Sequence, residues 1–501
     1  MGGMTDALGI EHVFVLMLEN RSFDHMLGFS AIAGTDAVTG QKTRINGLIG
    51  TESNALNGQE YNVSPGADYR MPTDPGHEFP DVLHQLCGLA ATYQPGGEYP
   101  PVDDSGFVGS YVAGRGAVPG EIMKCYLPEQ LPVLNALAQE FVVCDNWHAS
   151  MPGPTWPNRM FVHAASSGGL DHSPTTAEIA EWEAIDGFGL KNGTVFDALQ
   201  EKGIPRKLYG GDDFPMVAAL KGIHLDDVRH YSLFAGDVAQ PNYPDRYIFI
   251  EPSYDVLHDY KAGSSQHPLA DVTNGEALIK ATYEAIRNSP VWGSSILIIT
   301  WDEHGGFYDH AIPPPAPSPG DTIPGGKYNN NGFTFQQYGP RVPAIVISPL
   351  IPKNLVDHRL YDHSCIPKLL ESLFGMQPLT ARDANAAHLE ALVTLSAARA
   401  DAPETLPAPA NSAPLVPSFI ATAPAPDVAA ESVTRPDDSV DEGNLPAIVH
   451  SAMQQDLAVS PPEARSAIVA RVASLQIRSD ASQYMAEVQQ KVRQRRPIAP
   501  G

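Results

Sequence analysis

Two polar pairs in the chain carry side chains that could hold a metal ion. Glu19 and Asn20 directly follow one short apolar run, and Asp302 and Glu303 directly follow another. Carboxylate and amide oxygens are ligands that divalent cations prefer, and two adjacent buried carboxylates are costly unless a cation pairs with them. These four residues are therefore candidates to bind a divalent metal ion. The alternative is a polar helix cap after the first run and a solvated acidic loop after the second.

Thr155, within the segment SMPGPTWPNR, is a candidate hydroxyl nucleophile. Pro154 precedes it, and Pro157 fits the first turn of a helix. A hydroxyl there would lie beside free backbone N–H groups and the positive end of the helix dipole, where an attacked phosphate is favoured. Asn158 and Arg159 could contact phosphate oxygens from the same helix. The alternative is that Thr155 only caps the helix.

Several further side chains could transfer a proton or contact a phosphate. His77 lies in TDPGHEF and His267 in SSQHPLADVTNGE, while Arg21 and His304 flank the two polar pairs. Histidine titrates near neutral pH, so it is the usual side chain for proton transfer. The alternative for each histidine is a structural role, because a chain with 17 of them places some near a motif by coincidence.

Short apolar runs alternate with helical patterns along most of the chain. Runs rich in Val, Ile or aromatic residues predict buried parallel strands at 13–18, 141–144, 247–250, 296–300 and 344–347. Helical patterns cover 131–139, 159–165, 195–201 and 275–288. This alternation indicates an α/β sandwich over a parallel sheet. Ligands bind outside the carboxyl ends of such strands, so the two polar pairs are expected to converge there.

The composition changes after residue 385. We expect a main domain with the motifs over 8–385, an Ala- and Pro-rich extended segment over 386–444, and a helical appendage over 445–501. The basic end of the appendage, KVRQRR, either docks on the acidic body or transiently touches membrane phosphates. We favour docking.

The formal net charge is −26, which excludes a nucleic-acid partner because an acidic surface repels polyanions over roughly 10 Å. No run reaches about 18 apolar residues, and the first ten residues lack the pattern of an export signal. We expect a cytoplasmic protein, or one exported without a cleaved signal. The four cysteines have no metal-binding spacing, and buried thiols are favoured over disulfides.

The segments ENRSFDH, PGPTWPNR and DEHGGFYDH, in this order and spacing, resemble a bacterial phosphoesterase family. That family contains phosphatidylcholine-preferring phospholipases C and a type of acid phosphatase. The resemblance covers about residues 10–380. It implies an alkaline-phosphatase-like, three-layer α/β/α sandwich with a mostly parallel central sheet. It also implies that the Thr155 hydroxyl is the nucleophile and joins Glu19, Asn20, Asp302 and Glu303 around the metal.

The resemblance further implies that His77 and His267 stabilise phosphoryl oxygens or transfer protons. Many relatives carry two consecutive histidines where this chain has Gln266-His267, so one phosphate contact of the family pattern is in doubt. Arg21, Asn158 and His304 are further candidates for phosphate contacts. Oxygen ligands suit Ca²⁺, Mg²⁺ or Mn²⁺, whereas relatives often use zinc, so we expect Zn²⁺ or Ca²⁺.

The implied activity is metal-dependent hydrolysis of a phosphoric ester. We expect a phospholipase C that cleaves phosphatidylcholine-type diesters through a phospho-threonine intermediate. An acid phosphatase acting on monoesters would use the same metal and nucleophile, and it stays as an alternative. A second alternative, an inactive relative that acts as a binding protein, does not explain why both halves of the metal site are intact.

Overall fold

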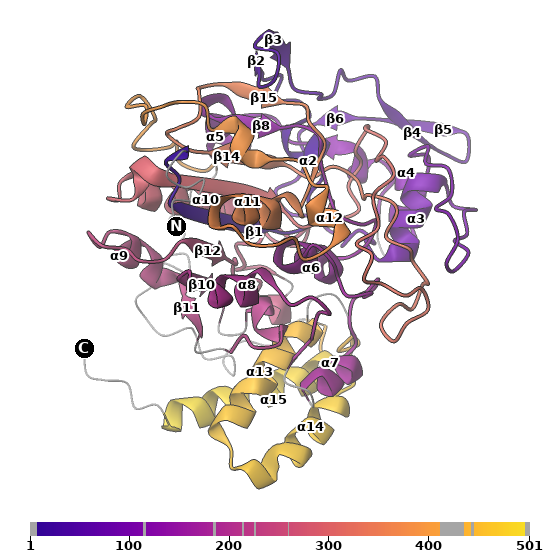
Figure 1. Ribbon diagram of the computed structural model, residues 1–501. Helices are drawn as coiled ribbons and strands as arrows, with labels where there is room; N and C mark the ends of the chain where they lie inside the picture. Colours follow the sequence, from indigo (N-terminus) through magenta and orange to yellow (C-terminus); the bar gives the residue numbers. More distant parts are fainter. Residues whose placement is uncertain are drawn as a thin grey trace.

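The computed structural model describes residues 8–113, 117–183, 187–212, 215–224, 227–258, 260–410, 435–441 and 445–495. Its centre is a ten-stranded sheet (Figure 1). In sheet order the strands are β11 (Val228–His230), β10 (Arg206–Gly210), β12 (Tyr247–Ile250), β1 (His12–Leu18), β13 (Ser295–Trp301), β14 (Ala344–Ile347), β8 (Val142–Cys144), β15 (Leu355–Asp357), β2 (Ala33–Asp36) and β3 (Lys42–Arg44). All of the strands expected from the sequence are present.

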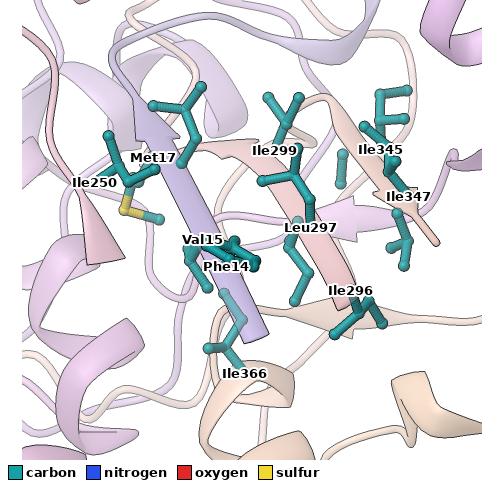
Figure 2. Close-up of a cluster of buried hydrophobic side chains, with 14 of the residues drawn as sticks. Phe14, Val15, Met17, Ile250, Ile296, Leu297, Ile299, Ile345, Ile347 and Ile366 are labelled. Carbon is teal, nitrogen blue, oxygen red and sulfur yellow. The ribbon is translucent and has the colours of Figure 1, made fainter. Parts of the chain in front are cut away.

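The central strands β1 and β13 are buried over their whole length. They pair in parallel from His12 with Ser295 to Leu18 with Trp301. A parallel strand that is covered on both faces has no solvent side, so its sequence is almost continuously apolar rather than alternating. Figure 2 shows these side chains packed together, with Ile366 from a covering helix pointing toward β1.

The predicted parallel direction of the strand at 344–347 is wrong. β14 runs antiparallel to both of its neighbours, β13 and β8. Within the continuously described stretch 260–410, no helix lies between β13 and β14. The chain therefore re-enters the sheet at the same end of the strands where it left, so the neighbouring strands β13 and β14 run antiparallel. An apolar run does not reveal direction. The remaining central pairs are parallel, so the sheet is mostly parallel as expected.

Helices cover both faces of the sheet and form the outer layers of a three-layer α/β/α sandwich. α10 contacts α5 and α9, and α5 contacts β8 and β14. A second group, in which α6, α8 and α11 contact one another, covers the other face. Their bounds are α5 (Pro132–Glu140), α9 (Phe234–Val238), α10 (Val272–Arg287), α6 (Thr155–Ala164), α8 (Val195–Glu201) and α11 (Cys365–Phe374). α6 begins four residues before its expected start and includes Thr155.

Smaller elements surround this core. The helices are α2 (Phe23–Leu27), α3 (Phe79–Cys87), α4 (Phe107–Tyr111), α7 (Thr176–Glu183) and α12 (Ala381–Ala384). The two-stranded pairs are β4 (Ser53–Leu56) with β5 (Gln59–Asn62), β6 (Ser64–Pro65) with β7 (Lys124–Cys125), and β9 (Trp147–His148) with β16 (Tyr361–Asp362). The four cysteines are unpaired thiols, as expected.

The C-terminal part forms three helices, α13 (Leu445–Val459), α14 (Arg465–Ala473) and α15 (Arg478–Arg495), drawn yellow in Figure 1. α13 and α14 pack against α7, and Asp441 accepts a 2.7 Å hydrogen bond from the Thr176 backbone N–H. Between the main domain and these helices, Leu389 and Leu406 are buried in the main core. Residues 411–434 of the expected extended segment lie outside the described residues. No described helix is both long and apolar enough to cross a bilayer.

Candidate active site

The two polar pairs lie together at the carboxyl ends of β1 and β13. Asn20 N–H donates a 3.0 Å hydrogen bond to Asp302 Oδ1, and Glu303 N–H donates to the same oxygen at 2.7 Å. The backbone N–H of Arg21 donates to the Glu303 carbonyl oxygen at 2.9 Å. The side chains of Glu19, Asn20, Asp302 and Glu303 are all fully buried. Parallel pairing of neighbouring strands thus joins residues that are about 280 positions apart in the sequence.

Thr155 is the first residue of α6, and its side chain does not cap that helix; Pro154 occupies the N-cap position. Thr155 Oγ1 instead accepts a 3.1 Å hydrogen bond from Asn20 Nδ2. The same Nδ2 also bonds Glu303 Oε1. The hydroxyl therefore lies at the positive end of a helix dipole and beside the buried carboxylates.

The donor set at the strand ends fits a divalent cation. Asn20 Oδ1 is buried without a hydrogen-bond partner. Burial raises the pKa of Glu19 well above its ordinary value, and it raises the pKa of Asp302 to about 7, although Arg159 lowers both. Neighbouring carboxylates add to these shifts. A cation among these oxygens would balance their charge and give Asn20 Oδ1 a partner.

A second acidic cluster, Asp24, Asp309 and His310, has ligand atoms within 4.8 Å of one another. The guanidinium of Arg341 already bonds both carboxylates, at 3.0 Å to Asp24 and 2.8 Å to Asp309. His310 Nδ1 is 2.6 Å from the other Asp24 oxygen. Because protein groups already balance the charge of these carboxylates, we assign the cluster a structural role.

His267 lies in the loop between β12 and α10, and its ring stacks on Tyr260 at a centroid distance of 3.5 Å. Leu269 N–H donates a 3.3 Å hydrogen bond to Nδ1, so the hydrogen of the neutral ring is on Nε2. Nε2 lies 3.6 Å from Asp74 Oδ2. Burial lowers the pKa of His267 well below its ordinary value, and nearby His77 lowers it further. His267 is therefore a neutral hydrogen-bond donor.

His77 lies beside His267, with ring centroids 6.2 Å apart. Its Nδ1 donates a 2.9 Å hydrogen bond to the Pro75 carbonyl oxygen, so Nε2 is the atom that can exchange a proton. Burial lowers the pKa of His77, but the charges of Glu303 and Asp74 outweigh burial and raise it to about 10. In the metal-free protein His77 is therefore cationic at neutral pH, in contrast to His267.

The sequence pattern of the phosphoesterase family matches residues 10–377. The chain belongs to the phosphoesterase family. Similar relatives include non-specific phospholipase C3 of Arabidopsis thaliana, 34% identical over 81% of this chain and 77% of that protein. Non-specific phospholipase C6 of the same plant is 36% identical over 79% of this chain and 75% of that protein. Phospholipase C B of Mycobacterium tuberculosis is 28% identical over 75% of this chain and 74% of that protein.

Similar solved structures include an alkaline phosphatase superfamily protein from Vibrio parahaemolyticus, 15% identical, with a TM-score of 0.31 over 52% of this chain and 64% of that chain. The sheet order described above, and not this likeness, defines the fold. Membership of the phosphoesterase family confirms the expected reaction class. The protein is a phosphoric ester hydrolase.

Arg21, expected to contact phosphate, makes its hydrogen bonds to the protein. Its Nε donates to the Gln266 carbonyl oxygen at 2.7 Å, and Nη2 donates to the His267 carbonyl oxygen at 3.2 Å. The guanidinium also lies 4.8 Å from the centre of the Phe307 ring. These contacts hold the loop that carries His267.

Asn158 and His304 bond to the protein in a similar way. Asn158 accepts from Met151 N–H at 3.1 Å and donates to the Gly153 carbonyl oxygen at 3.0 Å, so it shapes the loop before Thr155. His304 Nε2 lies 2.7 Å from Gln85 Oε1.

Gln266, in place of the first histidine of the family pair, has its side chain bonded between two core groups. Its Nε2 donates to the Val272 carbonyl oxygen at 2.9 Å, and its Oε1 accepts from Trp301 Nε1 at 3.0 Å.

Sequence reasoning missed Glu251, which is the first residue after β12 and 1% exposed. Its carboxylate lies 3.7 Å from Arg159, whose Nε bonds Asp302 at 2.9 Å. A signal was present, because Glu251 follows an apolar strand in the same way as Glu19 follows β1. What the sequence does not show is that β12 lies directly beside β1 in the sheet.

Proposed function

We propose that this phosphoesterase is a metal-dependent phospholipase C that cleaves phosphatidylcholine-type diesters to diacylglycerol and a phosphorylated head group. The names of the plant and mycobacterial relatives support a phospholipid substrate. The observation that carries the proposal is the bonding of one Asn20 amide to both Thr155 and Glu303, which joins the hydroxyl to the buried carboxylates.

The residues that would hold the metal are Glu19, Asn20, Asp302 and Glu303, together with the Thr155 hydroxyl. Their all-oxygen donor set accepts Zn²⁺ or Ca²⁺. When bound, the ion supplies positive charge that lowers the pKa of the Thr155 hydroxyl and offsets the negative charge of the phosphoryl group.

The Thr155 hydroxyl gives its proton to solvent, and Oγ1 attacks phosphorus while the bond from phosphorus to the diacylglycerol oxygen breaks. His77 protonates that leaving oxygen from Nε2, since Nδ1 is bonded to Pro75. Water then attacks phosphorus, the bond from phosphorus to Thr155 Oγ1 breaks, and neutral His77 takes a proton from this water. The phosphorylated head group leaves, Thr155 Oγ1 takes a proton back from solvent, and both the Thr155 hydroxyl and cationic His77 are restored.

His267 donates a hydrogen bond from neutral Nε2 to a phosphoryl oxygen, at which negative charge accumulates in the transition state. Arg21 positions His267 through its carbonyl oxygen. Asn158 positions the loop before the nucleophile, and His304 Nδ1 lies 3.4 Å from a carboxylate oxygen of Glu303. These three residues act on the protein, and none of them is needed as a direct phosphate contact.

The test compares p-nitrophenyl phosphorylcholine with p-nitrophenyl phosphate, for the wild type and Thr155→Ala. Each protein is assayed as purified, after EDTA, and after return of Zn²⁺ or Ca²⁺. We expect the wild type to cleave the diester, EDTA to abolish this cleavage, and Thr155→Ala to remove it.

Thr194→Ala is a matched control, because Thr194 caps α8 by accepting a hydrogen bond from Asp197 N–H. It removes a cap, costs about 1 kcal/mol of stability, and should keep full activity. Wild-type turnover of the monoester alone would identify an acid phosphatase. Full activity of Thr155→Ala would refute the proposed nucleophile.

A further inference from the structure

A small pocket lies beside the nucleophile helix α6. Trp156, Arg159, His163 and Glu251 contribute its polar lining. Three buried nitrogen atoms there have no hydrogen-bond partner: Trp156 Nε1, Arg159 Nη1 and His163 Nδ1. The three residues are spaced three and four apart, so they form one stripe on α6. Buried polar atoms without partners are rare, and each of these therefore requires an explanation.

Arg159 connects this pocket to the proposed metal site. Its Nε donates a 2.9 Å hydrogen bond to Asp302 Oδ2, and Nη2 donates to the carbonyl oxygens of Met17 and Leu18 at 3.3 and 3.1 Å. A guanidinium has five N–H groups. Nη1 has no hydrogen-bond partner, and it lies 3.7 Å from Oε1 of Glu251, which also lines the pocket.

The sheet and its own burial fix the position of Glu251. It directly follows β12, which pairs with β1 up to Ile250 and Leu16. Its backbone N–H donates to the Tyr209 carbonyl oxygen at 2.9 Å. The side chains of Glu251 and Arg159 are only 1% and 4% exposed. A buried carboxylate requires a compensating charge, and Arg159 provides it.

We propose that Glu251 is a positioning residue for the metal ligand Asp302, and that Arg159 transmits its effect. This inference rests on the proposed metal-dependent function. Glu251 and Asp302 share the positive charge of the Arg159 guanidinium, so that neither carboxylate forms an exclusive ion pair with it. Asp302 thereby keeps negative charge for the metal while its orientation stays fixed. Hydrogen-bonded partners behind metal ligands commonly act in this way.

The pocket is large enough for one water molecule. Its volume is about 20 Å³, which is enough for a single water. The nitrogens without partners belong to three residues that line it, Trp156, Arg159 and His163, and buried waters typically make about three hydrogen bonds. A water at this place would give Arg159 Nη1 a hydrogen-bond partner.

The experiment measures Zn²⁺ binding to metal-free protein by calorimetry, together with thermal unfolding. Glu251→Gln removes the charge without changing the shape of the side chain, and we expect it to weaken zinc binding about 10- to 100-fold. Glu276→Gln is the matched control, because Glu276 is equally buried but bonds Val133 and Leu134 N–H, at 2.8 Å each, in the other helix layer. We expect Glu276→Gln to lower the melting temperature and leave zinc affinity unchanged.

Wild-type zinc affinity in Glu251→Gln would overturn the inference while leaving the proposed function intact. A wild type that binds no zinc and cleaves no ester would overturn both. If Glu251→Gln does not fold, Glu251→Asp decides the question, because its shorter carboxylate retreats from Arg159. Zinc affinity equal to wild type in Glu251→Asp would then overturn the inference, and weaker binding would support it.

Discussion

Asn20 Nδ2 donates a 3.1 Å hydrogen bond to Thr155 Oγ1, although 135 residues separate the two. The contact joins the end of β1 to the start of α6. Asn20 reaches this geometry with a φ of 57°, in the left-handed region. Asparagine tolerates that region better than most residues because its short polar side chain can form local hydrogen bonds.

Two substitutions of Asn20 distinguish the role of its side chain in metal binding from the effect of its left-handed backbone on stability. Asn20→Gly and Asn20→Ala both remove a proposed metal ligand, so we expect both to weaken Zn²⁺ binding in calorimetry. The left-handed backbone conformation costs alanine about 1–2 kcal/mol, whereas glycine adopts it freely. Asn20→Ala should therefore be the less stable variant in denaturant unfolding. Asn57, exposed and at a φ of 51°, provides the control pair, with the same stability difference and no metal effect. Wild-type zinc affinity in Asn20→Gly would rule out Asn20 as a ligand.

The two histidines should respond differently to the leaving group. A general acid matters most when the leaving oxygen is strongly basic, as in diacylglycerol, and much less for p-nitrophenolate. We expect His77→Asn to lose about 100- to 10,000-fold in kcat on phosphatidylcholine and far less on p-nitrophenyl phosphorylcholine. His267→Asn should lose similar activity on both substrates, since it acts on a phosphoryl oxygen. Equal losses on both substrates for His77→Asn would remove it as the general acid.

Gly275 lies inside α10, yet it cannot be replaced by alanine without a clash. A Cβ at this position would lie 2.1 Å from Gln266 Cγ. Alanine normally gains up to about 1 kcal/mol over glycine in a helix, but here we expect a net loss of about 1–3 kcal/mol from overpacking. The loss should be smaller when Gln266→Ala is added. Gly236→Ala in α9, where a Cβ meets nothing, should instead stabilise the protein, and chemical denaturation measures all three variants.

The sequence predicted the elements better than it predicted the contacts. β1 and β13 were predictable because full burial makes them continuously apolar, and their ends located the polar pairs. The direction of β14 was not, since it depends on where the loop after β13 re-enters the sheet. Strand order likewise decides that Glu251 lies behind Asp302, and no local pattern encodes it. Arg21 shows the same limit, because a motif identifies a cation without showing which carbonyl oxygens it bonds.

Stability should depend on pH through His172. Its ring lies 3.3 Å from Asp171 and 3.0 Å from Glu178. Burial lowers the pKa of His172, but hydrogen bonds to these two carboxylates outweigh it and raise the pKa to about 9. Because the pKa of His172 is higher in the folded state than in the unfolded state, its protonation stabilises the folded protein. This stabilisation is fully present below the unfolded-state pKa of about 6.5, and it is lost as the pH rises through 9.

We expect His172→Gln to lower the free energy of unfolding by at most about 3 kcal/mol near pH 6, and by little near pH 10. Urea unfolding of both proteins at the two pH values measures this difference. A loss of the same size at both pH values would show that packing, and not the charge of His172, is responsible.

Chemical trapping of the covalent intermediate identifies the nucleophile. Wild-type protein is mixed with p-nitrophenyl phosphorylcholine, quenched in acid during turnover, digested, and analysed by mass spectrometry. We expect a phosphorylcholine group covalently bound to Thr155, and its absence after EDTA treatment or in Thr155→Ala. Rapid turnover with the group on another residue, or undiminished turnover by Thr155→Ala, would contradict this expectation.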